Sequence, residues 1–264
     1  MNGRKFPYCI TDKWAKSKAM ERSGELSTYA PKTVILSRKS LRSMLARYAA
    51  VYVKPRVGSG GCGVMKAWKT PNGHFRYQIG RAKRTFSNYE SFYESILKEM
   101  KQEPYFVQQG IPLLQYKGRT FDFRIMIQKD ANGTWIVSGT VGRVAHPAKI
   151  VTNGSQGGTI YPVDHLLAPH TSAARRKELF RKIRWLGIAG TRQLQRRYPG
   201  IREIGMDIAV DRNLKPWILE ANTVPDICPF TKLRDRRMLR DIVRNGKRYG
   251  RKYNLVCKKA KQGL

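Results

Sequence analysis

Two short apolar segments in the last third of the chain, residues 203–211 and 216–221, flank a polar turn and predict a β-hairpin. An acidic residue interrupts each apolar run, Asp207 in the first segment and Glu220 in the second. Both lie about equally far from the middle of the turn, so the hairpin places them roughly opposite one another. Asn222 lies two residues after Glu220 and points to the same face, because side chains alternate along a strand.

Three oxygen donors that converge on one face of a hairpin form a candidate metal site. Magnesium prefers such a set, in which a few carboxylates are completed by phosphate oxygens and water. The competing interpretation is that Asp207 and Glu220 pair with two of the chain's many arginines as structural salt bridges. We favour the metal site because Asn222 adds nothing to a salt bridge, whereas its amide oxygen is a suitable ligand.

A glycine-rich stretch, residues 57–64, follows a short predicted strand that ends at Lys54. Gly58, Gly60 and Gly63 match G-x-G-x-x-G, but a dinucleotide-binding fold needs a helix directly after the glycines, and a hairpin follows here. The chain also lacks the P-loop Gly-Lys-Ser/Thr and the catalytic-loop motifs of kinases. Two interpretations remain: a flexible flap whose N–H groups close on phosphates beside Lys54, or an ordinary glycine-rich β-turn.

The rest of the chain mixes helices with strands and predicts an α+β fold. Apolar residues at helical spacing predict a helix over residues 40–50, and Ser87 with Glu90 predicts a capping box that opens another. The last 34 residues hold 13 Lys/Arg and two acidic residues, and predict a basic helix with a frayed end. Further elements are a hairpin of residues 64–69 and 75–80, strands at 105–111, 120–128 and 133–145, and a long basic helix at 173–198.

Charge is the unusual bulk property of this chain. It has 52 Lys+Arg against 18 Asp+Glu, a formal net charge of +34. Such an excess favours a polyanionic neighbour, which could be nucleic acid, an acidic polymer or an acidic protein surface. It says little about the chemistry that the chain performs.

The cysteines and the hydropathy of the chain indicate the cellular compartment in which it folds. The four cysteines lie far apart without a C-x-x-C pair, so we expect free thiols in a reducing compartment rather than a zinc site or a disulfide framework. No stretch approaches the roughly 20 consecutive apolar residues that cross a bilayer. The first residues contain no apolar run typical of a secretory signal. We therefore expect a cytoplasmic protein with no membrane span.

The glycine-rich stretch and the carboxylate hairpin resemble the ATP-grasp superfamily, and more closely its YheC/YheD-like, endospore coat-associated group. VYVKPRVGSGGCGV, TFDFRIMIQ and GMDIAVDRNLKPWILEANTVP carry the resemblance, which covers about residues 11–230. It implies an α+β ATP-grasp fold in which two α/β lobes grip the nucleotide between a glycine-rich flap and a metal-binding antiparallel sheet. The implied division is an N-terminal helix and linker (1–30), a lobe with the flap (31–106), a lobe with the metal site (107–230), and a basic C-terminal helix and tail (231–264).

The resemblance also implies a role for each matching residue. ATP binding would involve two phosphate-facing lysines, the lid glycines and an adenine-binding hinge: Lys13, Lys54, Gly60, Gly61, Gly63, Gln108, Gln109 and Ile111. Two catalytic arginines, Arg124 and Arg143, would face the γ-phosphate or an acyl phosphate. The metal ligands, for two Mg²⁺ ions, would be Asp207, Glu220 and Asn222. The acceptor side would be lined by Asn153, Gly157 and Gly158.

The function implied by the resemblance is an ATP- and Mg²⁺-dependent carboxylate–amine ligase that acts through an acyl phosphate on an acidic peptide or polymer. One alternative is a nucleotide-binding structural protein of the spore coat, without catalysis. A basic nucleic-acid-binding protein is the less favoured alternative. Because the motifs begin near residue 11, we expect the additional N-terminal domain of many ATP-grasp enzymes to be missing, so that the core, the basic tail or an acidic protein partner supplies substrate recognition.

Overall fold

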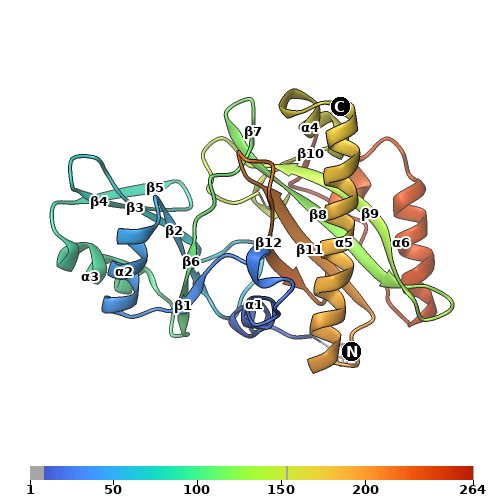
Figure 1. Ribbon diagram of the computed structural model, residues 1–264, viewed down its shortest axis with the longest axis horizontal. Coiled ribbons are helices and arrows are strands. Elements are labelled where there is room, and N and C mark those ends of the chain that lie inside the picture. Colours follow the sequence, from blue (N-terminus) through green and yellow to red (C-terminus); the bar gives the residue numbers. More distant parts are fainter. Residues whose placement is uncertain (1–8, 153, 264) are drawn as a thin grey trace.

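The computed structural model describes residues 9–152 and 154–263, which form two lobes (Figure 1). The smaller lobe is a six-stranded antiparallel sheet in the order β1-β6-β2-β3-β4-β5, with α2 and α3 packed on one face. Its other face is turned toward the larger lobe. The elements are β1 (Thr33–Ile35), α2 (Arg38–Arg47), β2 (Val51–Pro55), β3 (Met65–Lys69), β4 (Phe75–Ile79), β5 (Ala82–Phe86), α3 (Tyr89–Glu99) and β6 (Tyr105–Gln109).

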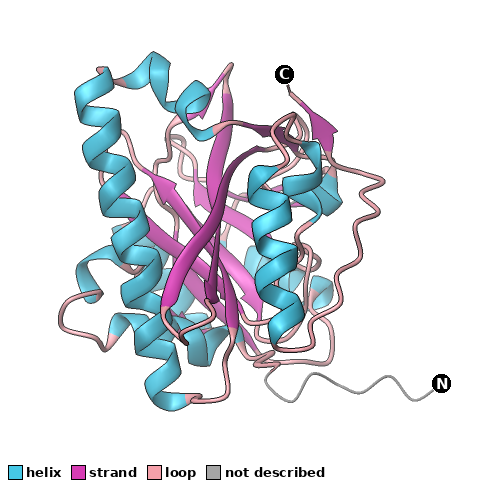
Figure 2. Cartoon of the chain, turned by 90° about the vertical axis from the view of Figure 1, so that its right-hand side faces the viewer, coloured by secondary structure: helices cyan, strands magenta, loops and turns pink. Residues whose placement is uncertain are grey.

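The larger lobe is built on a seven-stranded sheet in the order β12-β11-β8-β9-β10-β13, with β7 paired to β8. The long helix α5 and the shorter α6 pack on opposite faces (Figure 2), and α1 packs against β12 and α5. The elements are α1 (Lys13–Glu21), β7 (Gln115–Tyr116), β8 (Arg119–Lys129), β9 (Trp135–Val144), β10 (Thr159–Tyr161), α4 (Val163–Leu167), α5 (Ala173–Arg197), β11 (Glu203–Val210), β12 (Pro216–Asn222), α6 (Arg237–Arg248) and β13 (Lys261–Gln262).

Alternation along β8 sorts its side chains between the two faces of this sheet. Phe123 and Ile125 enter the core under α5, whereas Met126 enters the core under α6. Asp122 and Arg124 share the face of Met126 by the same period of two, with a register shift only after Met126. That face turns toward the smaller lobe at one end, so β8 presents charged side chains to the junction of the lobes.

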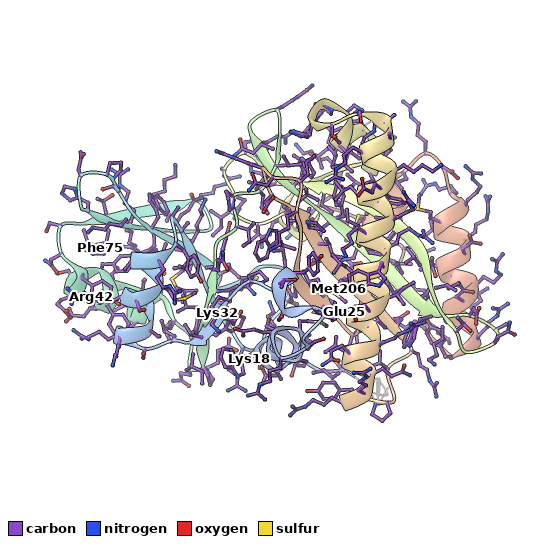
Figure 3. All side chains as sticks on the ribbon, viewed as in Figure 1. Lys18, Glu25, Lys32, Arg42, Phe75 and Met206 are labelled. Carbon is purple, nitrogen blue, oxygen red and sulfur yellow. A yellow bond between two sulfur atoms is a disulfide. The ribbon has the colours of Figure 1, made fainter. Side chains whose placement is uncertain are left out.

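Apolar burial explains the two lobes, because each has a core of its own. Phe75 packs against the core of the smaller lobe, and Met206 belongs to the α5-side core of the larger lobe (Figure 3). The proposed boundary between residues 106 and 107 falls within β6, which pairs with β1 and β2 along its whole length. Residues 13–21 pack on the larger lobe as α1.

Most predicted elements are present, with two local differences. The predicted capping box of Ser87 and Glu90 is wrong: the helix begins one residue later, and Asn88 accepts a hydrogen bond from the backbone N–H of Ser91. The predicted hairpin of residues 64–69 and 75–80 forms as β3 and β4, but it continues into β5, which the sequence analysis missed. Four of the five side chains of β5 are exposed, so burial leaves no apolar alternation to detect in this edge strand.

The prediction of free thiols is wrong for two of the four cysteines. Cys228 and Cys257 form a disulfide with their Cα atoms 5.1 Å apart, whereas Cys9 and Cys62 are free and exposed. The two half-cystines are 29 positions apart, and the fold of the tail brings them together. No local sequence motif predicts such a pairing, because it depends on how the tail folds back against the residues that follow β12.

The prediction of a frayed end is also wrong. After α6 the tail runs back along the larger lobe, and β13 pairs in parallel with β10. The phenol of Tyr253 donates to Glu203, a carboxylate that is only 2% exposed, and Arg251 donates to the same group at 2.8 Å. A buried acid in the sheet therefore fixes a tail whose own sequence carries few apolar residues. Among the described residues, no helix is long and apolar enough to span a membrane.

Candidate functional site

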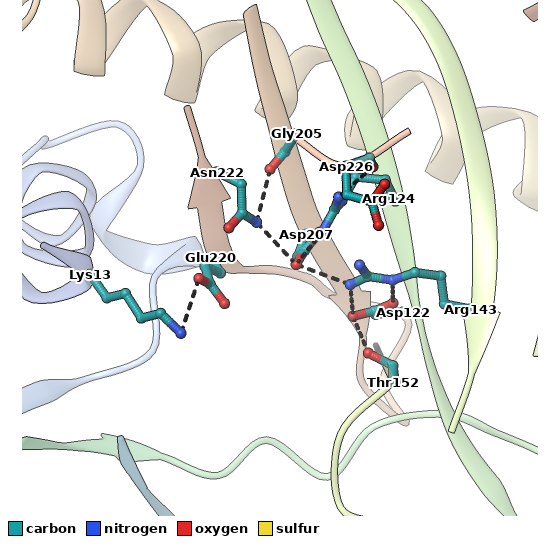
Figure 4. A network of polar contacts seen from close by, with 10 residues as sticks. All are labelled: Lys13, Asp122, Arg124, Arg143, Thr152, Gly205, Asp207, Glu220, Asn222 and Asp226. Carbon is teal, nitrogen blue, oxygen red and sulfur yellow. Dashed lines mark hydrogen bonds and ion pairs between the residues drawn. The ribbon is translucent and has the colours of Figure 1, made fainter. Parts of the chain in front are cut away.

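The carboxylate hairpin forms as predicted, from β11 and β12. Asp207 lies directly opposite Glu220 in the register, and the pairing shifts between Asp207 and Ile208. Like charges opposite one another on a sheet are destabilising by themselves. The Nδ2 atom of Asn222 lies 3.4 Å from the carbonyl oxygen of Gly205, and Asn222 shares the face of Glu220 (Figure 4). The fold thus gathers two acids and an amide on one hairpin.

Two arginines face these acids from the neighbouring strands. Arg124 lies opposite Asp207 and donates to both of its carboxylate oxygens, at 2.6 and 3.2 Å. Arg143 approaches the same carboxylate at 3.0 Å. Burial alone would raise the pKa of Asp207, but the two guanidinium groups outweigh it and lower that pKa, so the carboxylate stays ionised. The salt-bridge interpretation of Asp207 therefore describes contacts that are present in this structure.

Arg143 is held by two residues that the sequence analysis did not assign. Asp122 accepts from the guanidinium of Arg143 at 2.7 and 2.6 Å, and the hydroxyl of Thr152 donates to Asp122 at 2.6 Å. Burial by itself lowers the pKa of Arg143, but Asp122 and Asp207 raise it overall. A signal for Asp122 existed in the sequence, because it lies two residues before Arg124 and so shares its face.

Two lysines, Lys13 and Lys54, approach the same acids from α1 and from the smaller lobe. Asp12 caps α1, so that Lys13 begins the helix; its side chain is buried and its Nζ atom lies 3.4 Å from Oε1 of Glu220. Lys54 reaches in from β2 and donates to Oε1 of Gln108 at 2.5 Å. Burial lowers the pKa of Lys54 to about 8, although the charge of Glu220 opposes the shift.

The hinge residues Gln108 and Gln109 have different surroundings. Gln108 holds Lys54, whereas the side-chain oxygen of Gln109 accepts from the backbone N–H of Lys32 at 3.2 Å. The two residues are neighbours on β6, so their side chains alternate. The side chain of Gln108 faces the lysine, and that of Gln109 is tied to the chain before β1.

The glycine-rich flap between β2 and β3 adopts backbone conformations that favour glycine. Gly60, Gly61 and Gly63 have φ values of 65°, 76° and 71°, in the left-handed region. The side chain of Gln156, from the larger lobe, donates to the carbonyl of Gly60 at 3.0 Å. The flap is thus fastened across the junction of the lobes by a residue that the sequence analysis missed.

One cavity between the lobes brings most of the predicted residues together. It is lined by nine of them: Lys13, Lys54, Gly61, Gln108, Gln109, Ile111, Arg143, Asp207 and Glu220. Tyr52 and Leu219 add apolar walls that the sequence analysis did not assign. Four predicted residues are not among those that line the cavity: Arg124, Gly60, Gly63 and Asn222. Tyr52 could have been found, because it shares the face of Lys54 two residues away.

The predicted acceptor loop is the part that the structure supports least. Asn153 lies outside the described residues. Gly157 lies against the ring of His146, and the carbonyl of Gly158 accepts from Lys261 of the tail at 3.0 Å. Neither glycine lines the cavity. Gln156, directly before Gly157, contacts the flap at the carbonyl of Gly60.

The oxygen donors of Asp207, Glu220 and Asn222 fit a magnesium ion only if other oxygen ligands complete its coordination shell. The described residues contain no group of three or more His, Cys, Asp or Glu side chains able to hold a metal ion. Asp207 and Glu220 supply two carboxylates and Asn222 an amide, which suits an ion that keeps water and phosphate oxygens in its shell. Each carboxylate oxygen has two lone pairs, so a contact with arginine leaves acceptor capacity.

The balance of charge in the site suits an anionic ligand. Asp122, Asp207 and Glu220 carry three negative charges, and four cations surround them: Lys13, Lys54, Arg124 and Arg143. Buried cations in fixed positions can stabilise charge that develops during a reaction without reorganising. The arrangement can therefore bind and polarise a polyphosphate.

Comparison with solved structures finds distant likenesses. N5-carboxyaminoimidazole synthase from Aspergillus clavatus, in complex with ADP and 5-aminoimidazole ribonucleotide, aligns with a TM-score of 0.49 and 9% identity over 81% of this chain and 44% of its own. Carboxyaminoimidazole ribonucleotide synthase from the same organism, complexed with ATP, aligns with a TM-score of 0.49 and 11% identity. The alignment covers 81% of this chain and 45% of the synthase.

Comparison of sequences is more specific. The chain is 27% identical over 226 residues to the endospore coat-associated protein YheD of Bacillus subtilis (strain 168), covering 83% of this chain and 49% of YheD. It is 27% identical over 221 residues to YheC of the same strain, covering 82% of this chain and 60% of YheC. The chain therefore spans about half to three fifths of these relatives. The profile of the YheC/D-like ATP-grasp family matches residues 2–252, and the chain belongs to this family.

Proposed function

We propose that this chain is an ATP- and Mg²⁺-dependent ligase that joins a carboxylate to an amine through an acyl phosphate. The observation that carries the proposal is the arrangement of Asp207, Glu220, Arg143 and Lys54 around one cavity beneath a glycine flap. Membership of the ATP-grasp family supports it further. Because the chain spans only part of YheC and YheD, the proposal concerns this chain and not the whole relatives.

In the proposed reaction a carboxylate oxygen attacks the γ-phosphorus of ATP, the bond to the leaving ADP oxygen breaks, and an amine then attacks the acyl carbon and releases phosphate. Lys13 and Lys54 would neutralise the phosphates that stay with ADP. Arg143, oriented by Asp122, would stabilise charge on the transferring group. Asp207, Glu220 and Asn222 would hold magnesium, which neutralises phosphate charge when bound. Tyr52 and Leu219 would pack against the base.

The test combines nucleotide binding with chemical trapping. Calorimetry with Mg-ATP should show binding to the wild-type chain and at least about a tenfold loss in Glu220→Gln, because phosphates would then lose a metal-anchoring carboxylate. Glu25→Gln, at an exposed acidic position outside the site, is the matched control and should bind normally. Hydroxylamine converts an acyl phosphate to a hydroxamate, so incubation with ATP and an acidic peptide should give a hydroxamate only with an intact site. Absence of any ATP-dependent hydroxamate at saturating Mg²⁺ would contradict the ligase.

A structural role in the spore coat is the second candidate, and the names of the relatives favour it. In that case the nucleotide would stabilise the protein without turnover. Glu220→Gln separates the two candidates, because a ligase loses product formation whereas an assembly protein still reaches its location. Cytoplasmic localisation and association with the spore coat remain proposals that fluorescence microscopy of a tagged chain can test.

A further inference from the structure

A second cleft, of about 550 Å³, opens beside the nucleotide cavity at the junction of the two lobes. The two share walls, which are Tyr52, Ile111, Leu113, Thr120 and Ile150. The smaller lobe contributes the open face of its sheet. The larger lobe contributes the turn before β8 and residues 145–150. The cleft is therefore continuous with the site proposed above.

Long polar side chains cross the sheet in a straight row on the floor of this cleft. Tyr52 pairs in register with Lys66, Lys66 with Gln78, and Gln78 with Lys83. Neighbouring strands lie about 4.8 Å apart, so the row extends about 14 Å from the nucleotide cavity. Gln78 donates to the carbonyl of Ala148 at 3.1 Å and holds the larger lobe over the row. A row of this length accommodates several units of an extended chain.

The cleft is strongly cationic and contains no compensating acid. Its lining includes no Asp or Glu among the described residues, and none of its cations forms an ion pair there. Burial lowers the pKa of Lys66, which is half-buried without an anionic partner. In the nucleotide site, by contrast, Lys13 and both arginines have carboxylate partners. The cations of the cleft are Lys66, Lys83, Arg119, Lys149 and Arg212.

The segment that follows β9, with a turn at residues 147–148 and a bend at Ile150, links this cleft to the reacting centre. Lys149 and Ile150 line the cleft, and Thr152 donates to Asp122, which holds Arg143. Three residues of extended chain span at most about 10 Å. Ile150 lines both the cleft and the nucleotide cavity, so a ligand that lies along this segment can extend from one into the other.

We propose that the cleft binds an acidic peptide chain whose terminal or side-chain carboxylate is presented to the nucleotide site as the substrate. This inference rests on the proposed ligase function and assigns its substrate class. Five cations without acids match the repeated carboxylates of such a chain. A single-stranded nucleic acid would call for a series of aromatic platforms, and here Trp68 and Tyr52 are the aromatic residues in the lining.

The test measures binding of a fluorescent oligoglutamate peptide by polarisation, in the absence and in the presence of Mg-ATP. The cleft variant is Lys66→Gln with Lys149→Gln, which removes one charge from each lobe. The matched control is Lys177→Gln with Arg192→Gln, two exposed cations of α5 outside the cleft. The cleft variant should bind the peptide about tenfold more weakly, because two partly desolvated charge contacts are lost, while the control stays within about twofold. Mg-ATP affinity, measured by calorimetry, reports that the cleft variant is folded.

The outcomes separate this inference from the proposed function. Equal peptide binding by the wild type and the cleft variant overturns the cleft assignment. An oligothymidylate of equal length that binds through the cleft while the peptide does not overturns the substrate class in favour of nucleic acid. Peptide binding that depends on the cleft, but yields no hydroxamate with ATP and hydroxylamine, leaves the cleft assigned and contradicts the ligase.

Discussion

At the scale of single residues, the site is governed by which buried charge has a partner. Asp207 and Arg143 sit in a network of opposite charges, so both stay ionised over the physiological range. Lys54 has only the amide oxygen of Gln108 at hydrogen-bond distance, and burial lowers its pKa to about 8. The charge of Lys54 consequently responds to pH near neutrality.

We therefore predict that binding of Mg-ATP is coupled to protonation of Lys54. Above pH 8 the free protein holds this lysine neutral, and phosphate favours the charged form, so binding should take up close to one proton and weaken about tenfold per pH unit. Calorimetry at pH 8.5 in buffers of different ionisation enthalpy measures the uptake. Lys54→Arg keeps the charge and should show no uptake.

The same shift has a consequence for stability, with a definite sign. Because the folded-state pKa of Lys54 lies below that of the unfolded chain, the unfolded state binds more protons between about pH 8 and 10.5. The contribution of Lys54 to the free energy of unfolding therefore rises with pH in this window. Chemical denaturation of wild type and Lys54→Met across the window would contradict the assignment if the two pH profiles ran parallel.

At the scale of elements, the flap depends on one contact across the lobes. Its glycines adopt left-handed conformations, and Gln156 donates to the carbonyl of Gly60. Gln156 lies in a 3-10 turn in the loop that follows β9, and Thr152 of the same loop donates to Asp122, which holds Arg143. Closure of the flap and placement of the arginine are thus connected through a few residues of one loop.

We predict that Gln156→Ala loosens the flap without unfolding the protein. One neutral hydrogen bond contributes about 1 kcal/mol, so Mg-ATP should bind about three- to tenfold more weakly. Hydrogen exchange should accelerate at residues 57–63 and stay unchanged in the core strand β11. Gln193→Ala removes a comparable bond, to the carbonyl of Ala19, and is the matched control. Normal exchange in the flap of Gln156→Ala would mean that the contact does not hold it.

At the scale of the whole molecule, the C-terminal tail is fastened to the larger lobe at three places. It has the disulfide to Cys228, the contacts of Tyr253 and Arg251 with buried Glu203, and the pairing of β13 with β10. Cys228 lies six positions after Asn222, so the disulfide connects the tail to the loop that leaves β12. Arg124 donates to the carbonyl of Asp226 in the same loop at 3.2 Å.

We predict that the disulfide contributes substantially to stability. Closing a loop of 29 residues removes unfolded-state entropy worth about 3.6 kcal/mol in the chain-entropy description. Cys228→Ser with Cys257→Ser should lower the free energy of unfolding by about that amount, measured by urea denaturation. Reductant should lower the free energy of unfolding of the wild type by the same amount and leave that of the variant unchanged. Cys9→Ser with Cys62→Ser, at free exposed cysteines, should behave as the wild type.

Much of the fold, and the hairpin that carries Asp207 and Glu220, followed from local sequence patterns. The hairpin of β11 and β12 could be predicted, with Asp207 and Glu220 roughly opposite one another. Their direct pairing depends on the register shift between Asp207 and Ile208, which the sequence pattern did not show. A glycine-rich loop between β2 and β3 followed from the glycines placed after Lys54, and its closing on phosphates stays a prediction. The ATP-grasp fold followed from resemblance, and the family match confirms it.

Tertiary structure alone decided what lies between segments distant in the chain. The sequence could not pair Cys228 with Cys257, place Gln156 on Gly60, or gather cations from both lobes into one cleft, because each depends on how separate elements pack. Nor could it show that Arg124 and Arg143 meet Asp207, since antiparallel register across three strands sets that contact. Local periodicity determines which face a side chain takes; packing of one element on another determines what it meets there.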